Sequence, residues 1–388
     1  MNRTDNKIKV LVVFAAVKIY GMERANISVF ALLRDQGIDS LFVIGQWGLK
    51  EIAPELENQG LKYVTARFGG LIYKSQTLKE KLISIRDFFI GAIDLRKIIK
   101  EFKPHYIYIP NDLSFIMIFI TLITNKIPLI FRLGDKPTDY KLHFRILWKY
   151  FITKRVTKFV VNSKFIMNEL LKTGCVKEKV NLIYSYPPVR VSKIEKLSLP
   201  VIEKDGFVIL YVGQFNENKG VHLLLDAAEI LLNKYDDIYF IFAGDGDKQS
   251  KFYNEFINKI NLIDNKNKII FTGYVEDVDS LFGISSLHIC PSIYDEPLAN
   301  VVIEAKKNSV PSVIFKSGGL PELVEHLKDG YICEEKTTQE LVKAIEYFYL
   351  KRNDLYNYKY EAFHSLNKLG ITKTNFIKNW LEIFGCYK

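Results

Sequence analysis

The sequence predicts an α/β protein with two Rossmann-like, doubly wound domains that face a central cleft. Three observations support this prediction. Short apolar runs alternate with longer segments of helical period. Many of the runs are apolar throughout, which is typical of parallel strands buried on both faces. The alternation stops at a charged, proline-containing stretch near the middle of the chain and then restarts, as expected for a second domain of the same class.

Each run predicted to be a strand is short and rich in Val, Ile, Tyr and Phe. The predicted strands are 8–15, 40–45, 62–66, 106–110, 128–133, 158–162, 180–184, 207–212, 238–243, 268–272, 287–290 and 310–315. In open α/β sheets, ligands bind beyond the carboxyl ends of the strands. We therefore expect a site where the strand ends of two such domains meet.

The predicted domain division places one Rossmann-like domain at 1–190, a linker at 191–206 and a second Rossmann-like domain at 207–370. The linker contains Pro200 and several charges, and Pro187 and Pro188 come just before it. Residues 371–388 predict an amphipathic helix, because Phe376, Trp380 and Phe384 recur at helical spacing. We expect this helix to dock back on the first domain.

Charge divides the chain into two unlike parts. The whole chain has 54 Lys and Arg against 44 Asp and Glu. Residues 1–200 carry a net charge of +16 and residues 201–388 carry −6. The basic part would suit nucleic acid, an anionic membrane surface or a phosphorylated substrate. The ordinary hydrophobic and charged fractions, 48% and 25%, exclude wholesale disorder.

Cysteine usage and hydropathy indicate a cytoplasmic protein. The four cysteines lie far apart without a C-x-x-C pair, which argues against a disulfide scaffold or a zinc ribbon. The polar start of the chain predicts no signal peptide. The longest nearly uncharged apolar stretch, 113–123, is too short for a spanning helix and predicts a buried one.

The most specific stretch follows the predicted strand 287–290 and contains Glu296, Pro297 and Glu304. Pro297 suits the first turn of a helix, since its missing N–H would be unpaired there. Glu304 would then lie about two turns inside that helix. Free amides at a helix start attract a diphosphate, and carboxylates accept from sugar hydroxyls. The alternative is an ordinary helix entrance with a solvated Glu304.

Two glycine-containing turns accompany this stretch. Gly318 and Gly319 follow a predicted strand, where they would let the backbone approach a ligand or form an anion-binding nest. Lys219 lies at a predicted helix entrance, where it would meet a phosphate. The alternatives are a plain strand-to-helix turn for the glycines and a solvent-exposed lysine.

In this order, four blocks resemble glycosyltransferase family 4, the retaining enzymes of GT-B fold. The blocks are Gly213 with Lys219-Gly220, Ala243-Gly244-Asp245-Gly246, Glu296 with Glu304, and Gly318-Gly319-Leu320-Pro321-Glu322. The resemblance implies a hexosyltransferase whose donor is a nucleotide-diphosphate sugar. It further implies retention of anomeric configuration, with the leaving diphosphate taking the acceptor proton.

The resemblance also implies roles for single residues. Glu296 would bind and polarise the donor sugar, Glu304 would bind the ribose, and Lys219 would neutralise the diphosphate. Glu296 and Lys219 are thus the implied catalytic residues. The remaining implied donor-binding residues, several through backbone amides, are Gly21, Gly213, Gln214, Gly244, Pro297, Leu298, Ala299, Asn300, Val301, Gly318 and Gly319. The amides from Pro297 to Val302, with those of Gly318 and Gly319, would form the diphosphate cradle.

Some positions depart from the family pattern. Gln214 stands where the family often has Arg, and Pro110 and Gly134 stand at two usual histidine positions. Asn111, Arg132 and Asp135 follow or end predicted strands and are candidate acceptor contacts. A structural ion pair between Arg132 and Asp135 is the alternative. The histidines are scattered and no D-x-D is present at the usual place, so no metal or other cofactor is expected.

Segments 74–103 and 141–155 interleave cations with apolar side chains, which suits an anionic membrane leaflet. The alternative is a core-facing stripe with solvated lysines. The combined prediction is a bacterial enzyme of lipopolysaccharide or capsule assembly, peripheral on the cytoplasmic membrane face, with a glycan or lipid-linked acceptor. A GT-B enzyme of other chemistry, an epimerase or a phosphorylase, stays open. A nucleic-acid-binding protein also stays open, although no nucleic-acid-binding motif is present.

Overall fold

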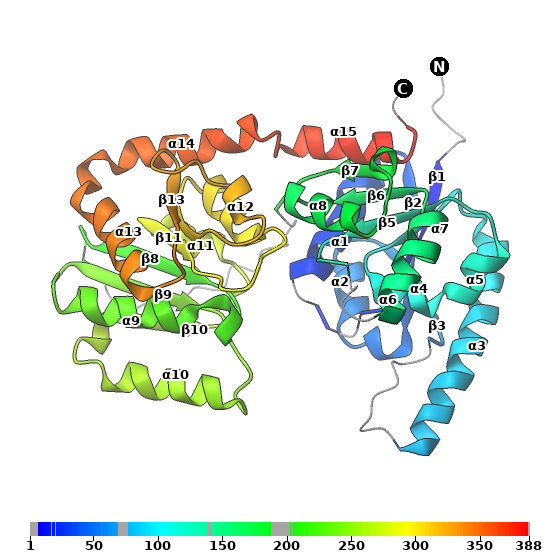
Figure 1. Ribbon diagram of the computed structural model, residues 1–388, viewed down its shortest axis with the longest axis horizontal. Helices are drawn as coiled ribbons and strands as arrows, with labels where there is room; N and C mark the ends of the chain where they lie inside the picture. Colours follow the sequence, from blue (N-terminus) through cyan, green and yellow to red (C-terminus); the bar gives the residue numbers. More distant parts are fainter. Residues whose placement is uncertain are drawn as a thin grey trace. The chain divides into compact units, whose positions relative to one another are not determined.

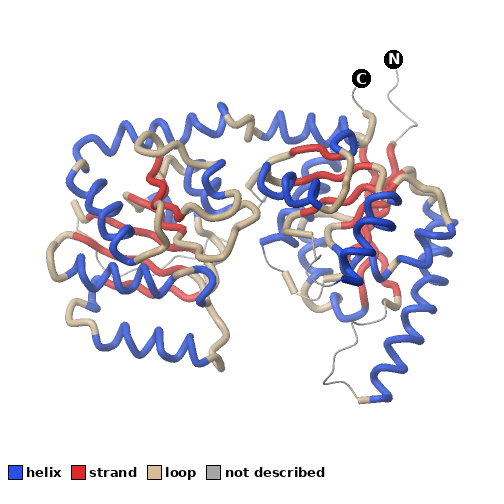
Figure 2. Tube along the Cα trace, viewed as in Figure 1, coloured by secondary structure: helices blue, strands red, loops and turns tan. Residues whose placement is uncertain are grey.

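A computed structural model of the chain describes residues 7–16, 18–19, 21–68, 77–137, 142–187, 202–203 and 205–386. The chain divides into two compact units, Met1–Val191 with Lys373–Lys388, and Ser192–Thr372. Most of the expected linker 191–206 lies outside the described residues. Each unit contains one parallel sheet with helices on its faces (Figures 1 and 2), as expected for Rossmann-like domains.

The sheet of the first unit has seven parallel strands in the order β3-β2-β1-β4-β5-β6-β7. Their bounds are β1 Ile8–Phe14, β2 Ile38–Gly45, β3 Lys62–Ala66, β4 Tyr106–Ile109, β5 Leu129–Leu133, β6 Lys158–Val161 and β7 Val180–Leu182. The helices are α1 Gly21–Leu33, α2 Ile52–Asn58, α3 Leu78–Phe102, α4 Asp112–Met117, α5 Phe119–Thr124, α6 Leu142–Leu147, α7 Thr153–Arg155 and α8 Lys164–Lys172. Strand order reverses between β1 and β4, so the topological switch point lies there.

The second unit has six parallel strands in the order β10-β9-β8-β11-β12-β13. Their bounds are β8 Phe207–Val212, β9 Ile238–Ala243, β10 Ile269–Gly273, β11 Leu287–Cys290, β12 Ser312–Phe315 and β13 Gly330–Cys333. The helices are α9 Val221–Leu232, α10 Lys251–Leu262, α11 Asp279–Gly283, α12 Asn300–Lys307, α13 Thr338–Leu350 and α14 Leu355–Lys368. Here the switch point lies between β8 and β11.

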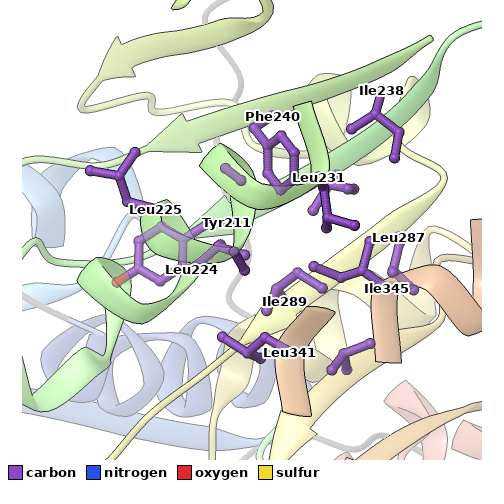
Figure 3. Packing of buried hydrophobic residues seen from close by; sticks show 14 of the residues in the cluster. Tyr211, Leu224, Leu225, Leu231, Ile238, Phe240, Leu287, Ile289, Leu341 and Ile345 are labelled. Atoms are coloured by element: carbon purple, nitrogen blue, oxygen red, sulfur yellow. The ribbon is translucent and has the colours of Figure 1, made fainter. Parts of the chain in front are cut away.

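Apolar side chains cover both faces of each sheet, which explains why most central strands are almost entirely apolar. In the second unit, α9 and α13 pack on one face: Leu224, Leu231, Leu341 and Ile345 meet the strand residue Ile289 (Figure 3). A separate cluster that includes Val208, Ile241 and Leu281 covers the other face. These packed layers hold the strand ends in fixed positions.

The last helix, α15 (Lys373–Ile383), packs into the first unit. Trp380 is fully buried in a cluster with Phe30 of α1 and Tyr108 of β4, and Phe384 after the helix joins them. The Trp380 ring lies 5.9 Å from the Tyr108 ring between centroids. This unit is therefore built from two separate stretches of the chain.

Two elements differ from the sequence expectation. The apolar stretch 113–123 forms α4 and α5, which are separated at Ile118, and Ile123 is exposed. Strand β13 was not predicted, because it has only four residues, begins with Gly330 and is followed by the charged Glu334 and Glu335. Its place in the sheet comes from parallel pairing with β12.

Candidate active site

The loops that follow β8 and β11 lie side by side at the switch point of the second unit. The N–H groups of Ile293 and Tyr294 both donate to the carbonyl oxygen of Asn218, at 2.9 and 3.1 Å. The Ser292 hydroxyl donates to the same oxygen at 3.3 Å. These bonds place the loop that carries Lys219 against the loop that carries Glu296, which is where ligands bind in such sheets.

Glu296 and Lys219 form an ion pair across these two loops. Glu296 is buried, with 6% of the residue exposed. Its Oε1 accepts from Lys219 Nζ. The same oxygen accepts from the Ser292 hydroxyl at 2.7 Å. A buried carboxylate needs such partners, because desolvation disfavours its charge. The lysine is about one third exposed and so can reach a ligand from solvent.

Lys219 is oriented by the turn on which it sits. Residues Glu217–Lys219 form one short 3-10 turn, and Asn216 Oδ1 accepts from the Lys219 N–H at 3.1 Å. Gly220 then takes φ +65°, and a Cβ there would lie 1.9 Å from the carbonyl oxygen of Pro291. The glycine is required by this close approach, after which α9 begins at Val221.

Gly318 and Gly319 pack directly against the backbone of Glu296. Gly318 has φ +55°, and a Cβ there would lie 2.2 Å from the Glu296 carbonyl oxygen. The Gly319 N–H donates to that same oxygen at 2.7 Å. The expectation that the Gly319 amide is open to a diphosphate is therefore wrong for this structure. The glycine pair supports the Glu296 loop instead.

Helix α12 begins later than the sequence predicts. It starts at Asn300, and Ala299 is its N-cap residue, so Pro297 and Leu298 lie in the preceding loop. The Glu296 carbonyl, which would accept the first bond of a helix starting at Pro297, is bonded to Gly319 instead. Pro297 also has no N–H to offer a diphosphate. Of the expected cradle, Asn300, Val301 and Val302 lie in the first turn, and the Val302 N–H donates to the Ala299 carbonyl at 3.1 Å.

The start of α12 has no side-chain cap, because Ala299 has no acceptor atom. Leu298 and Ala299 are buried. Uncapped N–H groups at a helix start, with the positive end of the helix dipole, form an anion-binding position. Glu304 lies about one turn inside the helix, not two, and is 6% exposed. The alternative interpretation, in which Glu304 is solvated, is therefore wrong.

Gly213, Gln214 and Gly244 follow the ends of β8 and β9. Gly244 has φ +141°, and a Cβ there would lie 1.8 Å from the Gly213 carbonyl oxygen. The Gly213 N–H donates to the Ala243 carbonyl at 3.0 Å, and the Gln214 carbonyl accepts from the Tyr211 hydroxyl at 2.7 Å. Close packing of the two strand ends thus accounts for Gly244, whereas a Cβ at Gly213 would lie 2.8 Å from the Tyr211 hydroxyl.

The candidate acceptor residues of the first unit differ in their surroundings. Asn111 caps α4, with its Oδ1 accepting from the Ser114 N–H at 2.8 Å. Arg132 on β5 is 4% exposed and donates to the Ser185 hydroxyl at 3.1 Å, and burial lowers the pKa of its guanidinium. Asp135 is exposed and accepts from the Lys136 N–H at 2.7 Å.

Gly21 is the first residue of α1, after β1, and is exposed. A Cβ there would meet nothing within 4 Å, so no packing contact requires a glycine. Gly134 follows β5, where a Cβ would lie 3.6 Å from the Met22 sulfur. The start of α1 and the loop after β5 are therefore neighbours.

Sequence reasoning missed two residues that hold the Glu296 loop. Lys336 Nζ donates to the Ile293 carbonyl at 2.6 Å and to the Ser317 hydroxyl at 3.0 Å. The Ser317 hydroxyl donates to the Tyr294 carbonyl at 2.7 Å. Lys336 follows two glutamates, a pattern typical of a solvated charge. Only its position after β13 could have indicated a role at the site, and that strand was not predicted.

Nearby titratable groups offer no thiolate or metal site. Burial, with a smaller effect of Glu296, raises the pKa of the Cys290 thiol to about 12, so it stays protonated at neutral pH. Within the described residues, no three His, Cys, Asp or Glu side chains are grouped so that they could hold a metal ion. No helix in that part of the chain is long and apolar enough to cross a bilayer.

Comparison with known proteins identifies glycosyltransferases among the relatives of this chain. The family described as "Glycosyl transferases group 1" matches residues 194–364, which lie within the second unit. A Haemophilus influenzae protein described as an uncharacterized glycosyltransferase is 27% identical over 337 residues, covering 84% of this chain and 86% of its own length. A 41.2 kDa protein from the cps region of Klebsiella pneumoniae is 22% identical over 311 residues, covering 78% and 77%.

Among solved structures, Anabaena HepE in complex with UDP and glucose superposes with a TM-score of 0.78. It is 19% identical, and the superposition covers 98% of this chain and 100% of that one. The comparisons support a GT-B glycosyltransferase. The likeness to HepE bears on the fold, whereas the group 1 match and the Haemophilus relative bear on the chemistry.

Proposed function

We propose that this chain is a retaining glycosyltransferase that uses a nucleotide-diphosphate sugar. The observation that carries the proposal is the buried Glu296–Lys219 pair at the switch point of the second unit, beside the uncapped start of α12. A diphosphate needs positive partners and a sugar needs hydroxyl acceptors. These residues offer both within two adjoining loops.

In the proposed reaction, the diphosphate binds at the start of α12, where the amides of Asn300 and Val301 face it. Lys219 leaves Glu296 for the phosphate, which frees the carboxylate to accept from the sugar hydroxyls. Negative charge grows on the diphosphate as the glycosidic bond breaks. Lys219 and the helix amides stabilise that charge most strongly in the transition state.

Retention follows if the departing diphosphate takes the proton of the acceptor hydroxyl on the face that it leaves. Glu304 binds the ribose in this scheme. No metal is required, because Lys219 and the α12 start supply the positive charge. We further propose that the acceptor is a glycan or lipid-linked glycan of bacterial surface polysaccharide assembly. The cps-region relative supports this choice.

A thermal-shift screen against UDP-, GDP- and ADP-sugars tests the donor. A donor at one hundred times its Kd should stabilise the protein by about 2.7 kcal/mol. Glu296→Gln and Lys219→Met should reduce the shift produced by the active donor. Lys234→Met is the matched control, since Lys234 pairs with Glu346 elsewhere in the same unit. If no nucleotide sugar stabilises the protein, the proposal is wrong.

Product analysis separates this proposal from other GT-B chemistry. NMR of the product should show a new glycosidic bond with the donor's anomeric configuration. The rate should be unchanged by EDTA. An isomerised nucleotide sugar without an acceptor would identify an epimerase, and phosphorolysis of a glycan would identify a phosphorylase.

A further inference from the structure

Helix α3 of the first unit carries an apolar stripe that the rest of the described chain leaves uncovered. At 3.6 residues per turn its five members fall within an arc of about 80°. They are Leu78, Leu82, Ile85, Phe89 and Ile93, each between 45% and 75% exposed. Scattered single apolar residues are ordinary on a surface, but a continuous row marks an interaction site.

The charges of α3 are sorted around this stripe. Lys79, Lys81 and Arg86 flank it, and Arg96 and Lys100 continue its line toward the end of the helix. The acids Glu80, Asp87, Asp94 and Glu101 recur every seven residues and therefore share one side, roughly opposite the stripe. The helix thus presents apolar and cationic groups together on one side.

Contacts with the body of the unit fix which side faces outward. Arg67, just after β3, forms a two-pronged ion pair with Asp94, with both N–O distances at 3.1 Å. A Cβ at Gly91 would lie 2.0 Å from the Arg67 carbonyl oxygen. The side of α3 that carries Gly91 and Asp94 is therefore held against the body, and Ala92 and Leu95 are buried there as well. The first turns extend past the sheet (Figure 1), and a capping box of Thr77 and Glu80 secures their start.

We propose that α3 binds an anionic lipid surface, lying in the interface with its stripe among the acyl chains and its Lys and Arg at the headgroups. Charge complementarity selects this occupant. A second copy would bring the same cations against one another, because the acids face away from the stripe. Anionic lipids supply negative charge all along the helix, and the first 200 residues carry the basic excess of +16.

The second cationic segment expected to contact a membrane is partly core-facing. Trp148 and Ile152 are fully buried, and the Arg155 guanidinium donates to the carbonyls of Leu122 and Ile127, each at 2.9 Å. Ile146, Tyr150 and Phe151 are between 45% and 51% exposed, so the core-facing alternative holds for only part of this segment. Lys141 lies outside the described residues. The proposal rests on α3, whose apolar row is continuous.

Co-sedimentation with vesicles of phosphatidylcholine, with and without about one quarter phosphatidylglycerol, tests the proposal on the full chain. Wild type should bind the anionic vesicles at low salt and bind much less to the neutral ones. The double variant Leu82→Glu with Phe89→Glu should lose at least tenfold in partitioning. Lys79→Glu with Arg86→Glu should remove the salt-sensitive part. Phe89→Trp fluorescence should be quenched by brominated lipid.

Leu262→Glu with Leu350→Glu is the matched control, because both leucines are exposed on helices of the second unit. It should bind vesicles as wild type does, and circular dichroism should show every variant folded. Failure of wild type to bind anionic vesicles, or equal binding by the stripe variant, overturns the proposal. So does a wild-type dimer that the stripe variant makes monomeric. The assay contains no donor, so its outcome is independent of the proposed transfer reaction.

Discussion

The helices beside the two switch points begin differently. In the first unit, Asn111 caps α4 through a side-chain oxygen that accepts a backbone N–H. In the second, α9 follows Gly220 and α12 follows Ala299, neither with a side-chain cap, although Ser250 caps α10 and Thr337 caps α13. A side-chain cap satisfies N–H groups that an uncapped start leaves for water or a ligand. The difference supports the diphosphate position proposed at the start of α12.

The largest expected effect on activity comes from replacing Gly318, which packs against the Glu296 loop before α12. Gly318→Ala combines φ +55° with a 2.2 Å overlap on the Glu296 carbonyl. We expect a loss of about 3 kcal/mol or more in the free energy of unfolding. Displacement of Glu296 by about 1 Å should lower kcat/KM roughly a hundredfold. Urea unfolding and steady-state kinetics measure the two.

Two control glycines separate the effect of positive φ from the effect of the steric overlap. Gly273 has φ +68° with open space around its Cβ position, so Gly273→Ala should lose only about 1 kcal/mol. Gly283 also has open space, and Gly283→Ala should be neutral or slightly stabilising. Equal kinetics for Gly318→Ala and Gly273→Ala would show that the glycine pair does not support the site.

Trp380→Ala should give the next largest effect, confined to the first unit. Removing this fully buried side chain should cost about 3–5 kcal/mol. Hydrogen exchange followed by mass spectrometry should show faster exchange in β1 and β4 but unchanged exchange in β8 and β11. Phe363→Ala, on the exposed side of α14, is the control. Equal loosening of both sheets would contradict the separate packing of the units.

The units also differ in the basic group that each buries in a central strand. In the first unit, β5 buries Arg132; in the second, β11 buries His288, whose Nδ1 lies 3.0 Å from the Ser312 hydroxyl. Burial lowers the pKa of His288 to about 3. Below pH 6.5, His288 is protonated in the unfolded chain but stays neutral in the folded one. The free energy of unfolding therefore falls as pH falls.

This pH dependence is testable by urea unfolding at pH 7 and pH 5. His288 should contribute a loss of about 2 kcal/mol over that interval, since each unit of pH below 6.5 is worth about 1.36 kcal/mol. His288→Asn, which keeps an acceptor for Ser312, should lack this part of the slope. An unchanged slope in the variant would mean that His288 is protonated in the folded protein.

The strands could be predicted because their signal is local. Each of β1 to β12 overlaps a predicted run, and central strands such as β5, β9 and β11 are buried at every residue and therefore apolar or nearly so. The start of α12 could not be predicted, because the Glu296 carbonyl is bonded to Gly319, which lies after the next strand. A helix boundary set by a partner so distant in the chain leaves no local trace.

The same distinction applies to the candidate site. Glu296, Glu304 and Lys219 were identifiable from their residue types and spacing. That Lys219 pairs with Glu296, 77 residues away, depends on the folded sheet. Lys336 was missed because its three partners are a carbonyl, a hydroxyl and a carboxylate brought together only by folding. Residues proposed to bind a ligand were thus easier to identify from sequence than those that position them.

The smallest expected effect tests the capping comparison directly. Ala299 has φ −84° and ψ 104°, a backbone conformation that suits an N-cap serine or aspartate. Ala299→Ser should stabilise the protein by about 0.5–1 kcal/mol while weakening donor binding several-fold, because its hydroxyl would take the amides proposed for the diphosphate. Ala299→Asp should weaken donor binding further through its charge.

Asn111→Ala makes the reciprocal change in the first unit. It should cost about 1 kcal/mol by removing the cap of α4, with donor affinity unchanged. Calorimetric titration with the donor and thermal unfolding measure both quantities for the three variants. Opposite signs of the stability change, with loss of donor affinity only at position 299, would establish that the α12 start serves the ligand. Unaltered donor affinity in both Ala299 variants would place the diphosphate elsewhere.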